Sequence, residues 1–174
     1  MNINEKACLI TKKFLHYTGR SGFSILELII VVTVIGVLAG IFIVSYSGIQ
    51  ERGRDTQRES DMLAVKSQLE VYFNENGSYP TAQTMTSSNG STIAGGSGIL
   101  KGLSADALVN PLASSGTTNS LMAISTGNPP NDVYWYQSYD SDGYTICGTA
   151  PCAKFKLMYT KETDGSTVTL SSIN

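Results

Sequence analysis

The chain changes abruptly from a polar, basic opening to a long apolar stretch. Residues 23–44 read FSILELIIVVTVIGVLAGIFIV, and no charged residue occurs between Leu28 and Val44. As a helix, these 22 residues would extend about 33 Å, which is enough to cross a hydrocarbon core of about 30 Å. The pattern predicts a membrane-spanning helix over residues 23–44.

Residues 45–76 continue the helix with an amphipathic pattern. Apolar side chains recur at steps of three, four and seven residues, and most other positions are charged or polar. Asn76-Gly77, followed by Pro80, is typical of a helix end with glycine in a left-handed cap. We expect one helix from Phe23 to Asn76, whose second half buries one face: Met62, Val65, Leu69, Tyr72 and Phe73.

Residues 77–131 are mostly polar and predict a loop region. Of the 15 residues in 84–98, 12 are Gly, Ser, Thr or Asn, so we expect a surface loop that contributes little to the core. Residues 104–109 predict a short helix. Residues 114–131, which contain Pro129-Pro130, again predict a loop.

Residues 132–174 have the alternation and turn signals of β-strands. Strands are expected at 133–138, 143–147, 153–160 and 166–171, separated by turn-forming sequences such as Asp164-Gly165. The predicted fold class is α+β, in which the amphipathic half of the long helix packs against a three- or four-stranded antiparallel sheet.

Composition and charge narrow the classes of function. Residues 23–174 carry 8 basic and 13 acidic side chains, a net charge of −5, which disfavours a nucleic-acid partner. The single histidine, His16, precedes the apolar stretch, so the remainder lacks the usual side chain of acid–base and zinc chemistry. We therefore expect no enzymatic activity and no cofactor.

The charges that flank the apolar stretch predict its orientation. Lys12, Lys13 and Arg20 precede it, which places the N-terminus in the cytoplasm and residues 45–174 outside. An uncut anchor and a secretory signal cut before Gly48 are two alternatives. Neither explains Glu27, whose carboxylate would cost about 2.5–3.5 kcal/mol at the bilayer centre and less near the interface.

Residues 22–27, GFSILE, resemble the class III signal of type IV prepilins, because they follow a short basic leader and precede a long apolar helix. The resemblance implies that a membrane peptidase cuts after Gly22, removes residues 1–22 as a leader and methylates the new N-terminus of Phe23. Residues 54–80 also resemble the helix end of bacterial pilins and type II secretion pseudopilins, down to the closing Asn-Gly-Ser-Tyr-Pro. The expected plan is the pilin lollipop.

The same resemblance gives roles to residues of the apolar helix. In a filament of staggered helices, Glu27 of one subunit would approach the α-ammonium of Phe23 on its neighbour, and the pair would set the axial register. Gly36 and Gly40 form a GxxxG spacing that permits close helix packing or local unwinding. Val44 stands where many pilins have a proline.

Two features near the C-terminus suggest further chemistry. Cys147 and Cys152 flank a four-residue turn, and outside the cytoplasm we expect them to form a disulfide. Asp140 and Asp142 are candidate calcium ligands, since some major pseudopilins hold that ion in a loop near their end, but turn formation is the favoured interpretation.

These observations predict a type IV pilin that polymerises with other pilins into a cell-surface filament. The partners it implies are a prepilin peptidase, an assembly ATPase, a membrane platform and, before assembly, the cytoplasmic membrane. One alternative is the major pseudopilin of a type II secretion system. A second is a membrane-anchored extracellular binding module that never polymerises.

Overall fold

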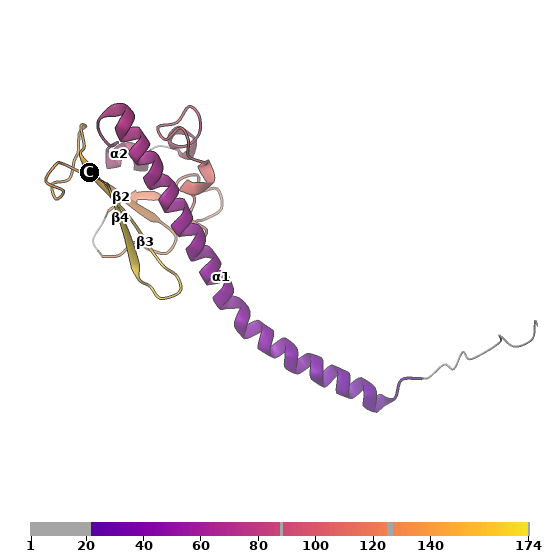
Figure 1. Ribbon diagram of the computed structural model, residues 1–174. Coiled ribbons are helices and arrows are strands. Elements are labelled where there is room, and N and C mark those ends of the chain that lie inside the picture. The colour runs from indigo at the N-terminus through magenta and orange to yellow at the C-terminus, as the bar shows by residue number, and fades with distance from the viewer. Residues whose placement is uncertain (1–21, 88, 125–126, 174) are drawn as a thin grey trace, which may run out of the picture. The chain divides into compact units, whose positions relative to one another are not determined.

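The computed structural model describes residues 22–87, 89–124 and 127–173 of the chain (Figure 1). The predicted leader therefore lies outside the described residues, except for Gly22. The chain divides into two compact units, residues 1–44 and 45–174, which are considered separately below. The elements, in chain order, are α1 (Ile25–Asn76), α2 (Ala82–Ser87), α3 (Gly90–Ile93), the 3-10 turn η1 (Ala105–Leu108), β1 (Leu121–Ala123), β2 (Tyr134–Tyr139), β3 (Lys154–Thr160) and β4 (Thr167–Ser171).

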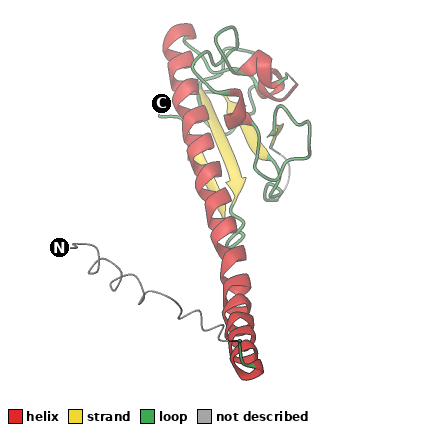
Figure 2. Ribbon diagram, turned by 90° about the vertical axis from the view of Figure 1, so that its right-hand side faces the viewer, coloured by secondary structure: helices red, strands yellow, loops and turns green. Residues whose placement is uncertain are grey.

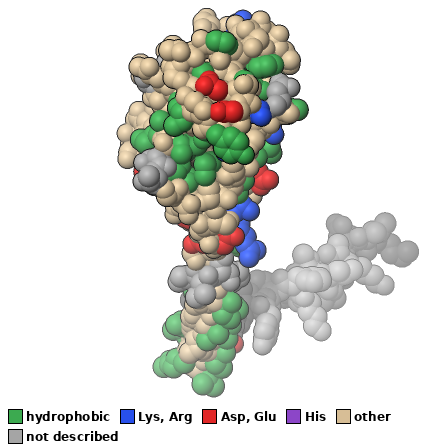
Figure 3. Space-filling view, turned by 90° about the vertical axis from the view of Figure 1, so that its left-hand side faces the viewer, with side chains coloured by type: hydrophobic (Ala, Val, Ile, Leu, Met, Phe, Trp, Pro, Cys, Tyr) green, Lys and Arg blue, Asp and Glu red, His purple; other side chains and the backbone are tan. Residues whose placement is uncertain are grey.

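The N-terminal unit contains the apolar part of α1. Every residue described between Gly22 and Ile41 is exposed in the single chain. Apolar side chains cover this part of the helix on the side seen in Figure 3. The unit has no hydrophobic core of its own among the residues described there, so its helix needs an apolar environment from outside the chain.

In the C-terminal unit, the later part of α1 lies along the sheet (Figure 2). Met62, Val65 and Leu69 have no exposed surface, which confirms the predicted buried face for these three, while Tyr72 and Phe73 are half-buried against the core. At the helix end, the N–H of Gly77 donates to the carbonyl of Phe73 at 2.7 Å, and Gly77 has a φ of 72°. Glycine meets that conformation without the strain that a side chain would add, as the sequence predicted.

The sheet has four strands in the order β1-β2-β3-β4, and it is mixed. β2, β3 and β4 are antiparallel neighbours, as expected, with Tyr136 opposite Leu157 and Leu157 opposite Leu170. The expectation of a wholly antiparallel sheet was wrong, because β1 pairs with β2 in parallel. β1 has only three residues and lies in a stretch whose polar composition predicted a loop.

The predicted strand at 143–147 is absent. The carboxylate of Asp142 accepts the backbone N–H groups of Tyr144 and Thr145, both at 2.9 Å, and the Thr145 hydroxyl at 2.6 Å. Those N–H groups are therefore withdrawn from a strand ladder. One isolated bridge, between Ile146 and Tyr139, remains where the strand was expected.

The prediction that residues 84–98 contribute little to the core was also wrong. They include most of α2 and all of α3, and their three apolar residues, Met85, Ile93 and Ala94, are buried in the core. The short helix expected at 104–109 is present as η1. In the second predicted loop, Leu121 of β1 is buried as well. A few apolar side chains thus anchor segments that are polar on average.

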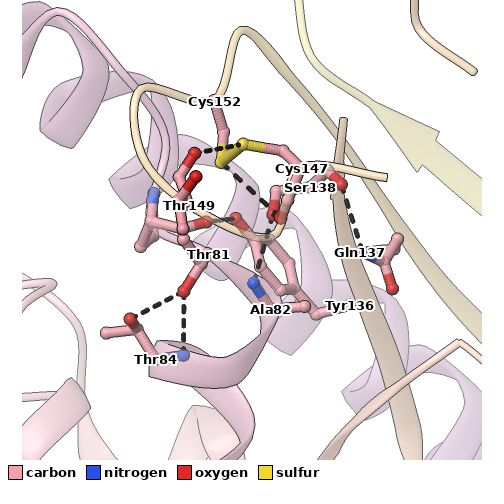
Figure 4. The surroundings of a disulfide bond; sticks show 10 residues. Thr81, Ala82, Thr84, Tyr136, Gln137, Ser138, Cys147, Thr149 and Cys152 are labelled. Atoms are coloured by element: carbon pink, nitrogen blue, oxygen red, sulfur yellow. Dashed lines mark hydrogen bonds between the residues drawn. A yellow bond between two sulfur atoms is a disulfide. The ribbon is translucent and has the colours of Figure 1, made fainter. Parts of the chain in front are cut away.

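Cys147 and Cys152 form the predicted disulfide, with a Cα–Cα distance of 5.6 Å (Figure 4). It joins two parts of the core. The N–H of Cys147 donates to the carbonyl of Ser138 at 3.0 Å, and the carbonyl of Cys152 accepts the N–H of Tyr79 at 2.8 Å. The disulfide therefore connects the end of β2 with the segment that follows α1, whereas a hairpin had been expected to frame it.

Candidate processing and assembly site

The predicted cleavage bond between Gly22 and Phe23 lies outside regular secondary structure. Residues 22–24 precede α1, which begins at Ile25. The side chain of Phe23 is 82% exposed. Because this peptide bond precedes the first helical turn, no intrahelical hydrogen bond has to break for a peptidase to bind the segment in an extended conformation.

Glu27 lies in the first turn of α1 and has a partner within its own chain. Its Oε2 accepts the backbone N–H of Ser24 at 3.3 Å, while the Ser24 carbonyl accepts the N–H of Leu28 at 3.2 Å. Ser24 is therefore the N-cap, and Glu27 occupies the position from which a capping box reaches back. A negative charge in the first turn also complements the helix dipole.

Gly36 and Gly40 both lie within α1, which is continuous through them. A Cβ atom built at either glycine would meet nothing within 4 Å. The single chain thus gives no reason for glycine at these positions, whereas a second helix approaching this surface would benefit from the missing side chains. Unwinding in a filament stays a prediction.

One helix in the described part of the chain, α1, is long and apolar enough to cross a membrane. Its apolar half carries Glu27 near its start and no other charge between Phe23 and Val44. The segment therefore combines a start outside regular secondary structure, a capped acidic first turn and a mostly apolar surface.

Comparison with known proteins identifies relatives that share part of this sequence. Over 62 residues, 36% of this chain, it is 36% identical to the type II secretion system core protein G of Dickeya chrysanthemi. The proteins of the same description from Escherichia coli K12 and Aeromonas hydrophila are 35% identical over 60 residues and 31% over 64 residues, which are 34% and 37% of this chain. These partial matches are consistent with the resemblance to type IV pilins and pseudopilins.

The likeness to these relatives is partial. The matched segments cover 40%, 41% and 45% of the Dickeya, Escherichia and Aeromonas proteins, respectively. No family model and no solved structure matches the chain. The α+β fold, with a long N-terminal helix and a four-stranded sheet, agrees with the superfamily.

The candidate calcium ligands lie in the turn after β2. Both oxygens of Asp142 accept hydrogen bonds from the chain, and the Thr145 hydroxyl, followed by the N–H groups of Tyr144 and Thr145, lowers the pKa of that carboxyl. Among the described residues, no group of three or more acidic, histidine or cysteine side chains is placed to hold a metal. Asp142 thus organises this turn, while calcium binding stays untested.

A charged cluster that was not predicted ties α1 to the turn between β3 and β4. Nη1 of Arg58, whose side chain has no exposed surface, donates to Oδ1 of Asp55 at 2.5 Å, and Nη2 lies 3.4 Å from Oε2 of Glu162. Arg54 donates to both oxygens of Glu162, at 2.8 and 2.6 Å. We call these four residues, with Thr163, the clasp.

Asp55 is the acceptor at the centre of the clasp. Its carboxylate accepts the N–H of Glu162 at 2.8 Å and both the N–H and the hydroxyl of Thr163, at 3.1 and 2.8 Å. Burial alone would raise the pKa of Asp55, but these hydrogen bonds outweigh it and lower the pKa. The hydrogen bond from Arg54 is the main cause of the lowered pKa of Glu162.

Sequence reasoning missed two features of the structure, the hydrogen bond between Ser24 and Glu27 and the clasp. The spacing of Ser24 and Glu27 is the signature of a capping box, so the sequence held a signal for that contact. For the clasp, only the Asp55/Arg58 spacing of three along a helix was readable. Its pairing with Glu162, more than 100 residues away, depends on the tertiary fold.

Proposed function

We propose that the chain is the pseudopilin of a type II secretion system, a structural subunit rather than an enzyme. The peptidase would cut after Gly22, the α-amino group of Phe23 would be methylated, and the apolar half of α1 would then pack against other copies. The sequence matches to secretion core proteins support this choice over the pilus subunit that the sequence first suggested. The proposal includes no cofactor.

The observation that carries the proposal is the uncovered apolar helix of the N-terminal unit. Phe23, Ile25 and Leu26 are 82%, 78% and 68% exposed in the single chain. Before assembly, the cytoplasmic membrane would cover these side chains, and in a filament the same surface would be covered by neighbouring helices. Both states keep residues 45–174 outside the cytoplasm.

Glu27 explains why cleavage and assembly are linked. Cleavage creates an ammonium group at Phe23, and in a staggered bundle this group from one copy meets Glu27 of the next. Each charge alone would be costly in an apolar bundle, so pairing them favours one axial register. The assembly ATPase and the membrane platform supply the work of extracting each subunit from the bilayer.

The mature N-terminus is the first test. Intact-mass and N-terminal peptide mass spectrometry on the protein from its producing cells should find methylated Phe23. Met1 at the N-terminus of functional protein would overturn the proposal in favour of an uncut anchor, and Gly48 would overturn it in favour of a secreted domain. Gly22→Val, which adds a branched side chain at the cleavage site, should retain residues 1–22.

The second test separates the charge of Glu27 from its capping role. Glu27→Gln keeps an acceptor for the Ser24 N–H but removes the charge, whereas Glu27→Ala removes both. We expect both variants to be cleaved and both to lose assembly, measured by cross-linking of membrane-embedded copies. Normal assembly of Glu27→Gln would show that charge pairing does not set the register.

Secretion distinguishes the pseudopilin from the pilus subunit. Cells without the chain should retain type II substrates in the periplasm, and the wild-type gene should restore their export. Unchanged export together with loss of long surface fibres would favour a type IV pilus. Electron microscopy of the same cells gives the second readout.

A further inference from the structure

A hollow of about 300 Å³ lies on the C-terminal unit. The ends of β2, β3 and β4 and the turn after β2 surround it. The side chains used in the argument below are Tyr139, Tyr144, Lys154, Lys156 and Ser171. We call it the lysine hollow.

The fold brings two ammonium groups to this hollow. Lys154 and Lys156 are two residues apart in β3, so their side chains leave the same face of the sheet. Tyr139 of β2 is opposite Lys154, and Nζ of Lys156 lies 5.0 Å from the centre of its ring. The Tyr139 ring thus holds Lys156 by a cation–π contact.

The turn after β2 makes room for Lys154. Gly143 has a φ of 74°, and a Cβ atom there would lie 3.3 Å from Cδ and 3.6 Å from Nζ of Lys154. Any other residue at this position would combine backbone strain with crowding against that side chain. Glycine therefore lets the lysine lie over the turn.

The positive charge of the hollow is not neutralised by an ion pair. Within the described ranges, no carboxylate lies within 4.0 Å of either ammonium group. Asp142 lines the hollow, but its two oxygens already accept three hydrogen bonds from Tyr144 and Thr145. Two cations against one engaged carboxylate leave the hollow with a net positive charge.

We propose that the lysine hollow binds a sugar acid, with the carboxylate between the ammonium groups of Lys154 and Lys156. Ser171 is opposite Lys156 in the sheet, so its hydroxyl can bond to a hydroxyl of the sugar, and the 85% exposed Tyr144 provides a ring face at the rim. A free phosphate, or an acidic side chain of another protein, would contact the two lysines but would not use the serine hydroxyl and the tyrosine ring. The inference is independent of assembly.

Ligand binding by the purified full chain in detergent tests this assignment. Saturation-transfer NMR with glucuronate, and with glucose as its neutral counterpart, should give weak, saturable binding of the acid and at least about tenfold weaker binding of glucose. Lys154→Gln and Lys156→Gln should each weaken glucuronate binding by about tenfold or more. Emission of the buried Trp135 verifies that each variant is folded.

Lys161→Gln is the matched control, because Lys161 follows the same strand but does not line the hollow. It should leave glucuronate binding within about twofold of wild type. Equal binding of glucose, equal loss in Lys161→Gln, or no saturable binding of glucuronate would overturn the proposal. So would competition by phosphate or a triglutamate peptide as strong as that of glucuronate.

Discussion

Removing Asp55 should destabilise the C-terminal unit more than removing Arg58, although the two side chains form one buried ion pair. Arg58 has no exposed surface, and its Nε has no hydrogen-bond partner among the residues that the structure describes. Asp55→Ala leaves that guanidinium with only Glu162 at 3.4 Å as a counter-charge, and it strips three donors of Glu162 and Thr163 of their acceptor. Breaking a buried pair in this way costs about 3–5 kcal/mol.

Arg58→Met should lower the free energy of unfolding less than Asp55→Ala does. The substitution removes the buried cation together with its desolvation cost and fills much of its volume with an apolar chain. Asp55 then keeps its three hydrogen bonds to Glu162 and Thr163, so its charge stays compensated. We expect a loss of at most about 2 kcal/mol, from the donors lost by Asp55 and by the Asn131 carbonyl.

Urea unfolding of the full chain in detergent micelles measures both losses. The protein has a single tryptophan, Trp135, which is 4% exposed and reports on the core through its fluorescence. Arg54→Met is the control, because its pair with Glu162 is partly exposed and should contribute less than the buried pair of Arg58 and Asp55. A loss in Arg58→Met equal to or above that in Asp55→Ala would refute the reasoning.

Three further predictions concern the same unit. The two carboxylates of the clasp have lowered pKa values in the folded chain, so their contribution is full above about pH 5 and is lost as the pH falls through their folded pKa values. The urea midpoint should therefore fall on acidification. It should fall less in Asp55→Asn, which lacks one of the two titrating carboxylates. Replacing Cys147 and Cys152 by alanine should cost about 2 kcal/mol, because the loop that they close is short, and a thermal melt unchanged by the replacement would contradict this. Gly90→Ala should cost about 1–3 kcal/mol, since its methyl group would overlap the Thr118 carbonyl oxygen. Gly96→Ala, where nothing lies within 4 Å, is its control, and equal urea midpoints for the two variants would refute the steric argument.

The elements predicted correctly are those with a strong periodic pattern. In α1, Met62, Val65 and Leu69 repeat at helical spacing, and burial of these three follows from geometry alone. The strands β3 and β4 are bounded by turn sequences, so their position was readable too. A pattern sustained over many residues leaves few alternative arrangements.

Short and sparse signals explain what was missed. Met85 and Ile93 anchor residues 84–98 in the core. The mean composition of this stretch is polar, so a prediction based on that mean did not detect the two buried side chains. β1 has only three residues, too few for alternation to be visible. At Asp142, a side chain took backbone donors that a strand would need, and a propensity argument that counts residue types does not anticipate that competition.

The apolar half of α1 follows a different energetic rule from the rest of the chain. In the described range 23–41, its large apolar side chains are between 48% and 82% exposed. Leaving them in water would cost on the order of 20 kcal/mol, which exceeds the 5–15 kcal/mol that typically stabilise a whole domain. The single chain therefore cannot be the state in which this segment works. Glu27 suits both environments that could cover it, because Ser24 provides a donor within the chain and a cleaved Phe23 would provide a cation from a neighbour.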